Sequence, residues 1–151
     1  MIKSISGIRG TIGGSVGDSF TPIDIVKFTS AYAKFILDQN NTSKKIIVGR
    51  DARISGKFVS DLVCGTLVGC GFDVVDVGLS TTPTIEVSVQ REKASGGIIL
   101  TASHNPKQWN ALKLLNNKGE FISADDGLKI LELAEKNNYH FSTIDKIGSL
   151  S

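Results

Sequence analysis

A polar segment that follows an apolar run brings together residue types that can do chemistry. Thr101-Ala102-Ser103-His104-Asn105-Pro106 comes directly after Gly97-Ile98-Ile99-Leu100, and Lys113 follows Ser103 by ten residues. A serine hydroxyl can act as a nucleophile when a base or a cation assists it, and imidazole and amine groups can move protons. The spacing predicts that a hydroxyl, an imidazole and an ammonium group gather where a buried strand ends.

Pro106 favours an exposed position for Ser103. Proline fixes its own φ and disfavours helical geometry at the preceding residue, so the loop is expected to be stiff and not to continue as a helix. The alternative is that Thr101, Ser103 and Asn105 only satisfy backbone groups at a tight turn, as polar residues after strands commonly do.

Helical and extended patterns alternate along the first half of the chain. Thr21-Pro22 predicts a helix start, with an apolar face and an end near Asn40. A strand is expected over 46–48, then a helix capped by Ser55 and stopped by Gly71, then a strand over 74–77. The expected face of the first helix comprises Val26, Ala33, Ile36 and Leu37.

The second half contains one conflict between local pattern and topology. Alternation over 85–89 resembles a strand, but a parallel crossover to the strand at 97–100 needs a helix. We therefore predict a helix that begins at Thr82-Pro83. Residues 112–115 and 120–122 are expected to form a hairpin around the turn at 116–119. A last helix, capped by Ser123, is expected to bury one face formed by Leu128, Leu131 and Ala134.

This order of elements predicts a single α/β domain with a mixed, mostly parallel sheet between helices. The loops that begin at Arg50, Ser80 and Thr101 each follow a predicted strand. In open α/β folds, ligands bind at the carboxyl ends of the strands, where these loops would lie. Ser103 is therefore expected at the edge of the sheet where a binding site belongs.

Composition excludes several classes of protein. The net charge is +2 over 151 residues, and no basic stripe is present, so nucleic acid is not expected as a partner. No apolar run is long enough for a membrane helix and no secretory leader is evident, which favours a cytoplasmic location without membrane contact. Cys64 and Cys70 are interpreted as buried thiols, because their spacing forms no metal-ligand pattern.

Four segments resemble the α-D-phosphohexomutases, the family of phosphoglucomutase, phosphomannomutase and phosphoglucosamine mutase. They occur in the family's order and lie within about residues 2 to 135. The segments are Ser6-Gly7-Ile8-Arg9-Gly10, Val48-Gly49-Arg50-Asp51-Ala52-Arg53-Ile54-Ser55-Gly56, Gly78-Leu79-Ser80-Thr81-Thr82-Pro83-Thr84, and the serine loop continued through Trp109-Asn110-Ala111-Leu112-Lys113. Two parts of the sequence depart from the common pattern. They are the segment Ile2-Lys3-Ser4-Ile5-Ser6, where many members have an aromatic residue followed by Gly-Thr, and Ala111, where glycine is common.

The resemblance implies a role for each of four residues. Ser103 would carry a phosphoryl group, and Lys113 would be the general acid/base for the sugar hydroxyl. His104 would share that role or hydrogen-bond the phosphate, and Arg9 would bind phosphate. The alternatives are a solvated lysine, a turn-stabilising histidine and a structural salt bridge of Arg9. For Arg50, Asp51 and Arg53 we expect a loop network that holds the site, because adjacent opposite charges usually pair.

The resemblance also implies a cofactor, an intermediate and partners. Phosphorylated Ser103 would supply one ligand of Mg²⁺, and absent domains would supply the others, because one oxygen cannot hold magnesium. Hexose 1,6-bisphosphate would be the intermediate, a hexose phosphate the substrate, and the remaining domains of the same full-length chain the partners. Residues 1–137 would form the N-terminal phosphoserine domain and 138–151 the start of a linker. Alone, the chain is expected to be inactive.

Two other functions stay open at this point. The first is a serine-dependent hydrolase or phosphatase, in which Asp51 would have to orient His104. No Gly-x-Ser-x-Gly elbow supports it. The second is a non-catalytic binding domain of the same fold, for which replacing Ser103 would leave activity unchanged.

Overall fold

The computed structural model describes residues 1–4, 7–39 and 43–151. Its described strands form one mixed sheet of six strands in the order β1-β2-β6-β5-β3-β4. Strand β3 pairs in parallel with β4 and β5, whereas β6 pairs antiparallel with β5 and β2, and β2 antiparallel with β1. The strands are β1 (Ile2–Ser4), β2 (Gly7–Thr11), β3 (Lys45–Arg50), β4 (Asp73–Leu79), β5 (Gly96–Leu100) and β6 (Trp109–Leu115).

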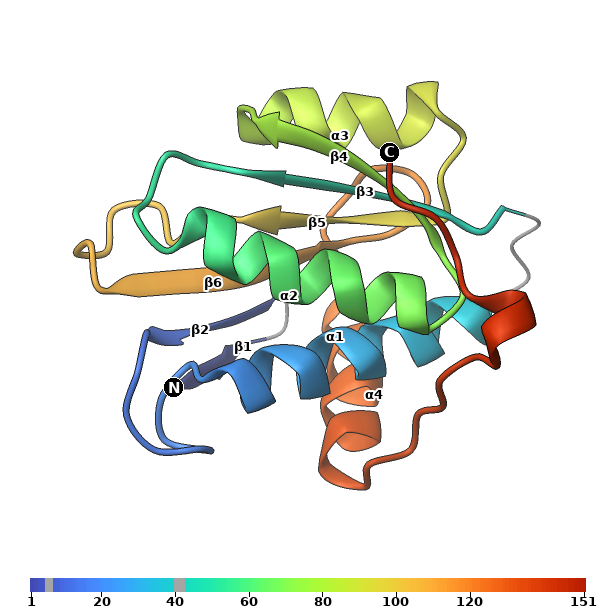
Figure 1. The fold of residues 1–151 in the computed structure, drawn as a ribbon. Coiled ribbons are helices and arrows are strands. Elements are labelled where there is room, and N and C mark those ends of the chain that lie inside the picture. The colour runs from blue at the N-terminus through green and yellow to red at the C-terminus, as the bar shows by residue number, and fades with distance from the viewer. Residues whose placement is uncertain (5–6, 40–42) are drawn as a thin grey trace.

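Helices cover the two faces of this sheet unequally (Figure 1). Helix α1 lies between α2 and α4 on one face, while α3 packs on β3 and β5 from the other face. The α/β architecture with a mixed sheet between helices is therefore confirmed, but parallel pairing is confined to β3 with β4 and β5, and the other three strand pairs are antiparallel. The helices are α1 (Pro22–Leu37), α2 (Gly56–Gly69), α3 (Thr82–Arg91), α4 (Ala124–Glu135) and the short 3₁₀ turn Ile144–Lys146.

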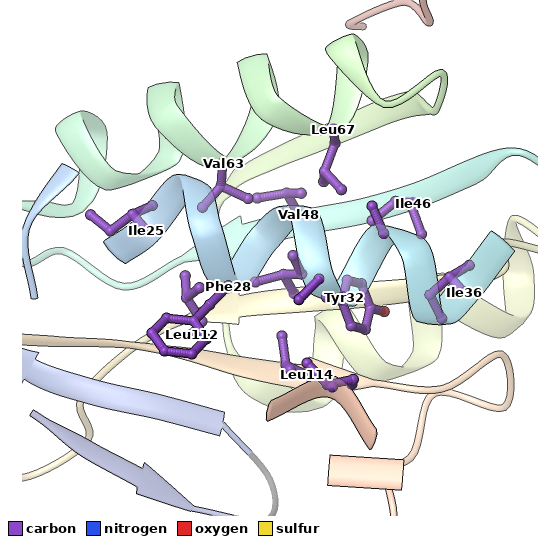
Figure 2. Packing of buried hydrophobic residues seen from close by; sticks show 14 of the residues in the cluster. Ile25, Phe28, Tyr32, Ile36, Ile46, Val48, Val63, Leu67, Leu112 and Leu114 are labelled. Atoms are coloured by element: carbon purple, nitrogen blue, oxygen red, sulfur yellow. The ribbon is translucent and has the colours of Figure 1, made fainter. Parts of the chain in front are cut away.

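The larger core lies between the sheet and helices α1, α2 and α4. Figure 2 shows how side chains of α1, among them Phe28 and Tyr32, point toward Val48 of β3 and Leu114 of β6. Tyr32 is completely buried, and its hydroxyl donates to the carbonyl of Leu115 in β6 at 2.6 Å and accepts from the amide of Gly97 in β5 at 3.0 Å. Because this hydroxyl is satisfied inside the core, it fixes α1 against two strands at little desolvation cost.

Local start and stop signals explain most of the helix boundaries. Thr21 caps α1 in a capping box with Asp24, and Ser123 caps α4 through the amide of Asp126. Gly71 adopts φ +95° directly after the last turn of α2, so a glycine is required where that helix ends. The crossover between β4 and β5 contains the predicted helix, α3.

Several details of the predicted elements are wrong. Thr81, not Thr82, caps α3. Ser55 occupies the N-cap position of α2, but its side chain makes no capping bond among the described residues. The second strand of the predicted hairpin is reduced to one bridge between Leu115 and Phe121. Leu128 is exposed, because α4 buries Ile130 instead.

Helix α1 also differs from its predicted form at its C-terminal end. It ends at Leu37, three residues before the expected end, and Asn40 lies outside the described residues. Leu37 is exposed rather than part of the buried face. Phe28 and Tyr32 face the sheet and set the rotation of α1 about its axis. This rotation turns Leu37 toward solvent.

Residues 138–151 leave the end of α4 and pass α2 to reach the outer edge of β4 (Figure 1). The amide of Gly148 donates to the carbonyl of Val68 in α2 at 2.9 Å. Leu150 then forms a parallel bridge with Val74 at the outer edge of β4. Backbone pairing, rather than burial of large side chains, therefore holds this segment, since Leu150 remains exposed.

Candidate functional site

The serine loop joins β5 to β6 and projects from the edge of the sheet. Strand β5 is buried along its whole length and ends at Leu100, and β6 begins at Trp109. Between them, Ser103 and His104 are exposed. The expectation that Ser103 is held out of the core at the end of a buried strand is therefore confirmed.

Ser103 has an unusual backbone conformation. Its φ is +53°, in the left-handed region, which residues other than glycine rarely adopt. The other two described non-glycine residues with positive φ, Lys93 and Asn137, follow the C-caps of α3 and α4, where such a conformation is common. Ser103 follows no helix, so its conformation must be enforced by the loop around it.

Lys113 reaches the hydroxyl of Ser103 from the adjacent strand β6. Its Nζ donates to Ser103 Oγ at 2.7 Å. Lys113 faces the same side of the sheet as Ile99, its partner in β5, because directly paired residues project to one face. The ammonium group is therefore directed at the serine by strand register.

Arg9 approaches the same place from β2. It pairs with Ala111 of β6, and Ala111 lies two residues from Lys113 on the same face of the strand. Arg9 is exposed, and within the described part of the chain it forms no ion pair, so the predicted alternative of a structural salt bridge is not seen there. Ser6, the first residue of this motif, lies outside the described residues.

All four predicted site residues line one pocket with a volume of about 290 Å³. Its described lining contains two cationic side chains and no acidic one, so the pocket favours an anion. An exposed imidazole, that of His104, adds a group that can donate to or accept from a ligand. The described lining residues are Arg9, Thr101, Ala102, Ser103, His104, Asn105, Ala111 and Lys113.

Thr101 supports the shape of the loop. Its hydroxyl accepts the amide of Ser103 at 3.1 Å, and the amide of Asn105 donates to the carbonyl of Ala102 at 3.0 Å. The reading of Thr101 as a residue that satisfies turn backbone is therefore confirmed. The hydroxyl of Ser103 differs, since it faces Lys113 rather than the turn.

The expected network of the Asp51 loop is present for Asp51 and Arg53, whereas among the described residues no side-chain hydrogen bond or ion pair of Arg50 joins it. Arg53 Nε lies 3.3 Å from Asp51 Oδ2, and the Arg53 amide donates to Asp51 Oδ1 at 3.1 Å. Asp51 is therefore engaged with Arg53, and none of the hydrogen bonds among the described residues joins it to His104. This arrangement gives no support to a hydrolase in which Asp51 orients His104.

Sequence reasoning missed how far Arg53 reaches. Its two terminal nitrogens donate to the carbonyls of Ser103, Asn105, Pro106 and Trp109, at distances of 2.8, 2.8, 2.7 and 3.2 Å. It also missed that Asn110 Nδ2 donates to Ser55 Oγ at 2.9 Å. The pairing of Arg53 with its neighbour Asp51 was visible in the sequence, but contacts with carbonyls some fifty positions away were not.

The described residues do not form a magnesium site by themselves. They contain no group of three or more histidine, cysteine or carboxylate side chains that could hold a metal. Mg²⁺ prefers six oxygen ligands, whereas the oxygen of Ser103 faces the ammonium group of Lys113. The described residues therefore offer at most a part of such a site. None of the described helices is long and apolar enough to cross a membrane.

Comparisons with known proteins agree with this fold. Residues 2–140 match the family model described as phosphoglucomutase/phosphomannomutase, alpha/beta/alpha domain I. A phosphoglucomutase/phosphomannomutase of Thermococcus kodakarensis is 32% identical over 93% of this chain and 31% of its own length. A phosphomannomutase of Klebsiella pneumoniae is 34% identical over 87% of this chain and 79% of its own length.

A solved structure supports the same relationship at the level of the fold. A phosphoglucomutase/phosphomannomutase family protein of Burkholderia thailandensis superposes with a TM-score of 0.79, at 20% identity, over 99% of this chain and 32% of its own. The chain spans about a third of the length of the first relatives that it matches, at 31% and 32%. From its fold, its motifs and the match over 2–140, the chain belongs to the α-D-phosphohexomutase family and corresponds to domain I of that family.

Proposed function

We propose that this chain is the phosphoserine domain of a mutase that interconverts hexose 1-phosphate and hexose 6-phosphate. The observation that carries the proposal is the 2.7 Å contact between Lys113 Nζ and Ser103 Oγ in a pocket that also contains Arg9. Names of relatives that include phosphomannomutase and phosphoglucosamine mutase support the reaction class.

The proposed step transfers a phosphoryl group from Ser103 to a free hydroxyl of a hexose monophosphate. The bond between phosphorus and Ser103 Oγ breaks, and a bond between phosphorus and the sugar oxygen forms, which gives a hexose bisphosphate. Lys113 donates a proton to the leaving Oγ and then accepts the proton of the sugar hydroxyl, so the lysine ends as it began. After the bisphosphate turns over, the reverse transfer returns the other phosphate to Ser103.

Charge stabilisation would come from the cations of the pocket. The transferring group carries negative charge on its peripheral oxygens, and stabilising it is the main task of the protein in phosphoryl transfer. Arg9 can offer two parallel donors to such a group, and His104 can donate one more. Mg²⁺ would supply further charge neutralisation, with one ligand from phosphorylated Ser103 and the others from outside this chain.

The division of the chain belongs to the same proposal. Residues 1–137 would form the phosphoserine domain, and 138–151 would lead toward the remaining domains of a longer protein. Those domains would supply the other metal ligands and the sugar-recognition groups, so the 151 residues alone would not turn over substrate. The pairing of Leu150 with Val74 would then set where that connection leaves the domain.

Replacement of Ser103 tests the proposal directly. In the full-length protein, Ser103→Ala is expected to lower turnover of hexose 1-phosphate by roughly 10³-fold or more, because loss of a covalent nucleophile removes the phosphoryl carrier. Ser80→Ala, in the neighbouring loop on the same edge, is the matched control and should keep turnover. Intact-mass measurement should find one phosphoryl group on the wild type and none on Ser103→Ala.

Two results would contradict the proposal. One is turnover by Ser103→Ala at the wild-type rate, which would favour a non-catalytic binding domain of the same fold. The other is a phosphoryl group that maps to a residue other than Ser103 in the wild type.

A further inference from the structure

Arg53 is the side chain that most fully engages the serine loop, although it does not line the pocket. A guanidinium group has five N–H donors in a planar fork. In Arg53, Nε faces Asp51 Oδ2, and each terminal nitrogen faces two carbonyl oxygens of the serine loop. Every donor of this side chain thus has a partner, and the side chain is only 11% exposed.

The four carbonyls belong to residues between Ser103 in the serine loop and Trp109, the first residue of β6. One of them is the carbonyl of Ser103 itself, the residue with φ +53°. A carbonyl that is fixed at 2.8 Å from a rigid fork restricts the rotation of its own peptide plane. Asp51 fixes the fork in turn, because it binds both the side chain and the backbone amide of Arg53.

A second contact ties the far end of the loop to the same segment. Asn110 Nδ2 donates to Ser55 Oγ at 2.9 Å, and Asn110 is completely buried. The segment from Asp51 to Ser55 therefore holds both the interior of the serine loop and its exit into β6. Lysine could not replace Arg53 in this role, because the three donors of an ammonium group lie on one nitrogen and cannot bond to four carbonyls at once.

We infer that Arg53 is a positioning residue that holds Ser103 in its left-handed conformation, so that Oγ is presented to Lys113 for phosphoryl transfer. The inference rests on the proposed function for its chemical consequence, but the conformational part stands on the contacts alone. A displacement of about 1 Å at a reacting atom can cost about 10²-fold in rate. Arg53 would act on kcat rather than on substrate binding, since it does not touch the pocket.

The test uses Arg53→Lys in the full-length protein, with Arg91→Lys at the end of α3 as the matched control for the same chemical change. We expect Arg53→Lys to lower kcat by about 10²-fold with KM within about twofold of the wild type. Hydrogen exchange of a peptide over 101–109 should become about tenfold faster, while peptides from α1 keep their rates. Arg91→Lys should change neither quantity.

A rescue experiment separates positioning from general destabilisation. Arg53→Ala leaves a gap of the shape of guanidinium, so millimolar guanidinium should restore part of the lost kcat, whereas methylammonium should not. Wild-type kcat and loop exchange in Arg53→Lys would overturn the inference, as would equal effects of the two cations on Arg53→Ala. Turnover by Ser103→Ala would instead remove the proposed function, and the exchange result would still decide whether Arg53 holds the loop.

Discussion

The two faces of the sheet are built from the same strands but differ in what covers them. One face carries α1, α2 and α4 over a continuous core, and the other carries α3 over a smaller core centred on β3 and β5 (Figure 1). In β6, Leu112 and Leu114 project to the first face and are buried, whereas Lys113 projects to the second. The covered face supplies stability, and the part of the other face that α3 leaves open supplies the candidate site.

Two adjacent residues of β6, Lys113 and Leu112, project to opposite faces, so their replacement is expected to have opposite consequences. Lys113→Ala is expected to lower turnover of the full-length protein by about 10²- to 10⁴-fold, because it removes the group next to Ser103 that we propose to transfer protons. The free energy of unfolding should change by less than about 0.5 kcal/mol, since the side chain is not part of a core. Steady-state kinetics and urea unfolding of the same preparation measure both quantities.

A large loss of stability in Lys113→Ala would contradict the division between the two faces. Retained activity would contradict the role of Lys113 and would agree with the alternative that it is an ordinary strand lysine.

Leu112 tests the covered face of the same strand. It is completely buried among side chains that include Phe28 of α1. Leu112→Ala should lower the free energy of unfolding by about 2–5 kcal/mol, because it removes buried methyl groups and leaves a cavity. Chemical denaturation measures the loss, and Leu112→Met is the control, with an expected cost below about 1.5 kcal/mol. Equal stability of Leu112→Ala and the wild type would show that this face is not the main core.

The pH dependence of stability is expected to report on the core of the covered face. Cys64 and Cys70 lie in this core, and burial raises the pKa of each thiol from about 9 to about 11. The folded state therefore holds these protons more tightly than the unfolded state does. The resulting stabilisation is fully present below about pH 9 and is lost as the pH rises from about 9 to about 11.

Urea unfolding at several pH values between 8 and 11 checks this expectation. The double variant Cys64→Ala, Cys70→Ala should show a flatter decline over the same range. Burial raises the pKa of Tyr32 as well, so a part of the decline should persist in the double variant. An identical decline in both proteins would show that the thiols do not contribute.

The sequence was sufficient for the parts of the molecule that local signals specify. Capping at Thr21 and Ser123, the glycine stop at Gly71 and the helix between two parallel strands each follow from residue type or from chain topology. For the site, the spacing from Ser103 to Lys113 was sufficient because the loop joins two neighbouring antiparallel strands. Lys113, the fifth residue of β6, then lies beside Ile99 near the end of β5.

Features that depend on long-range contacts could not be predicted. Nothing local in Gly7–Thr11 indicates that β2 joins the far side of β6 and so brings Arg9 to the pocket; only the family resemblance placed it there. The four carbonyls bound by Arg53 and the positive φ of Ser103 arise from how two loops meet. The predicted buried faces of helices were wrong where tertiary packing sets the rotation of the helix about its axis, as at Leu128 in α4.

The smallest effect concerns α3, the one described helix on the second face, and the exact residue at which it begins. The hydroxyl of Thr81 accepts the amide of Thr84, while Thr82 is the first helical residue. Thr81→Ala should lower the free energy of unfolding by about 1 kcal/mol, because the amide loses its partner, and Thr82→Ala should change it by only a few tenths of a kcal/mol. Thermal and urea unfolding of the two variants compare these neighbours directly.

A larger loss of stability in Thr82→Ala than in Thr81→Ala would show that Thr82 is the N-cap and that α3 begins one residue later. Since α3 covers only part of its face, neither variant should alter the contact between Lys113 and Ser103, and turnover of the full-length protein should stay at the wild-type level in both.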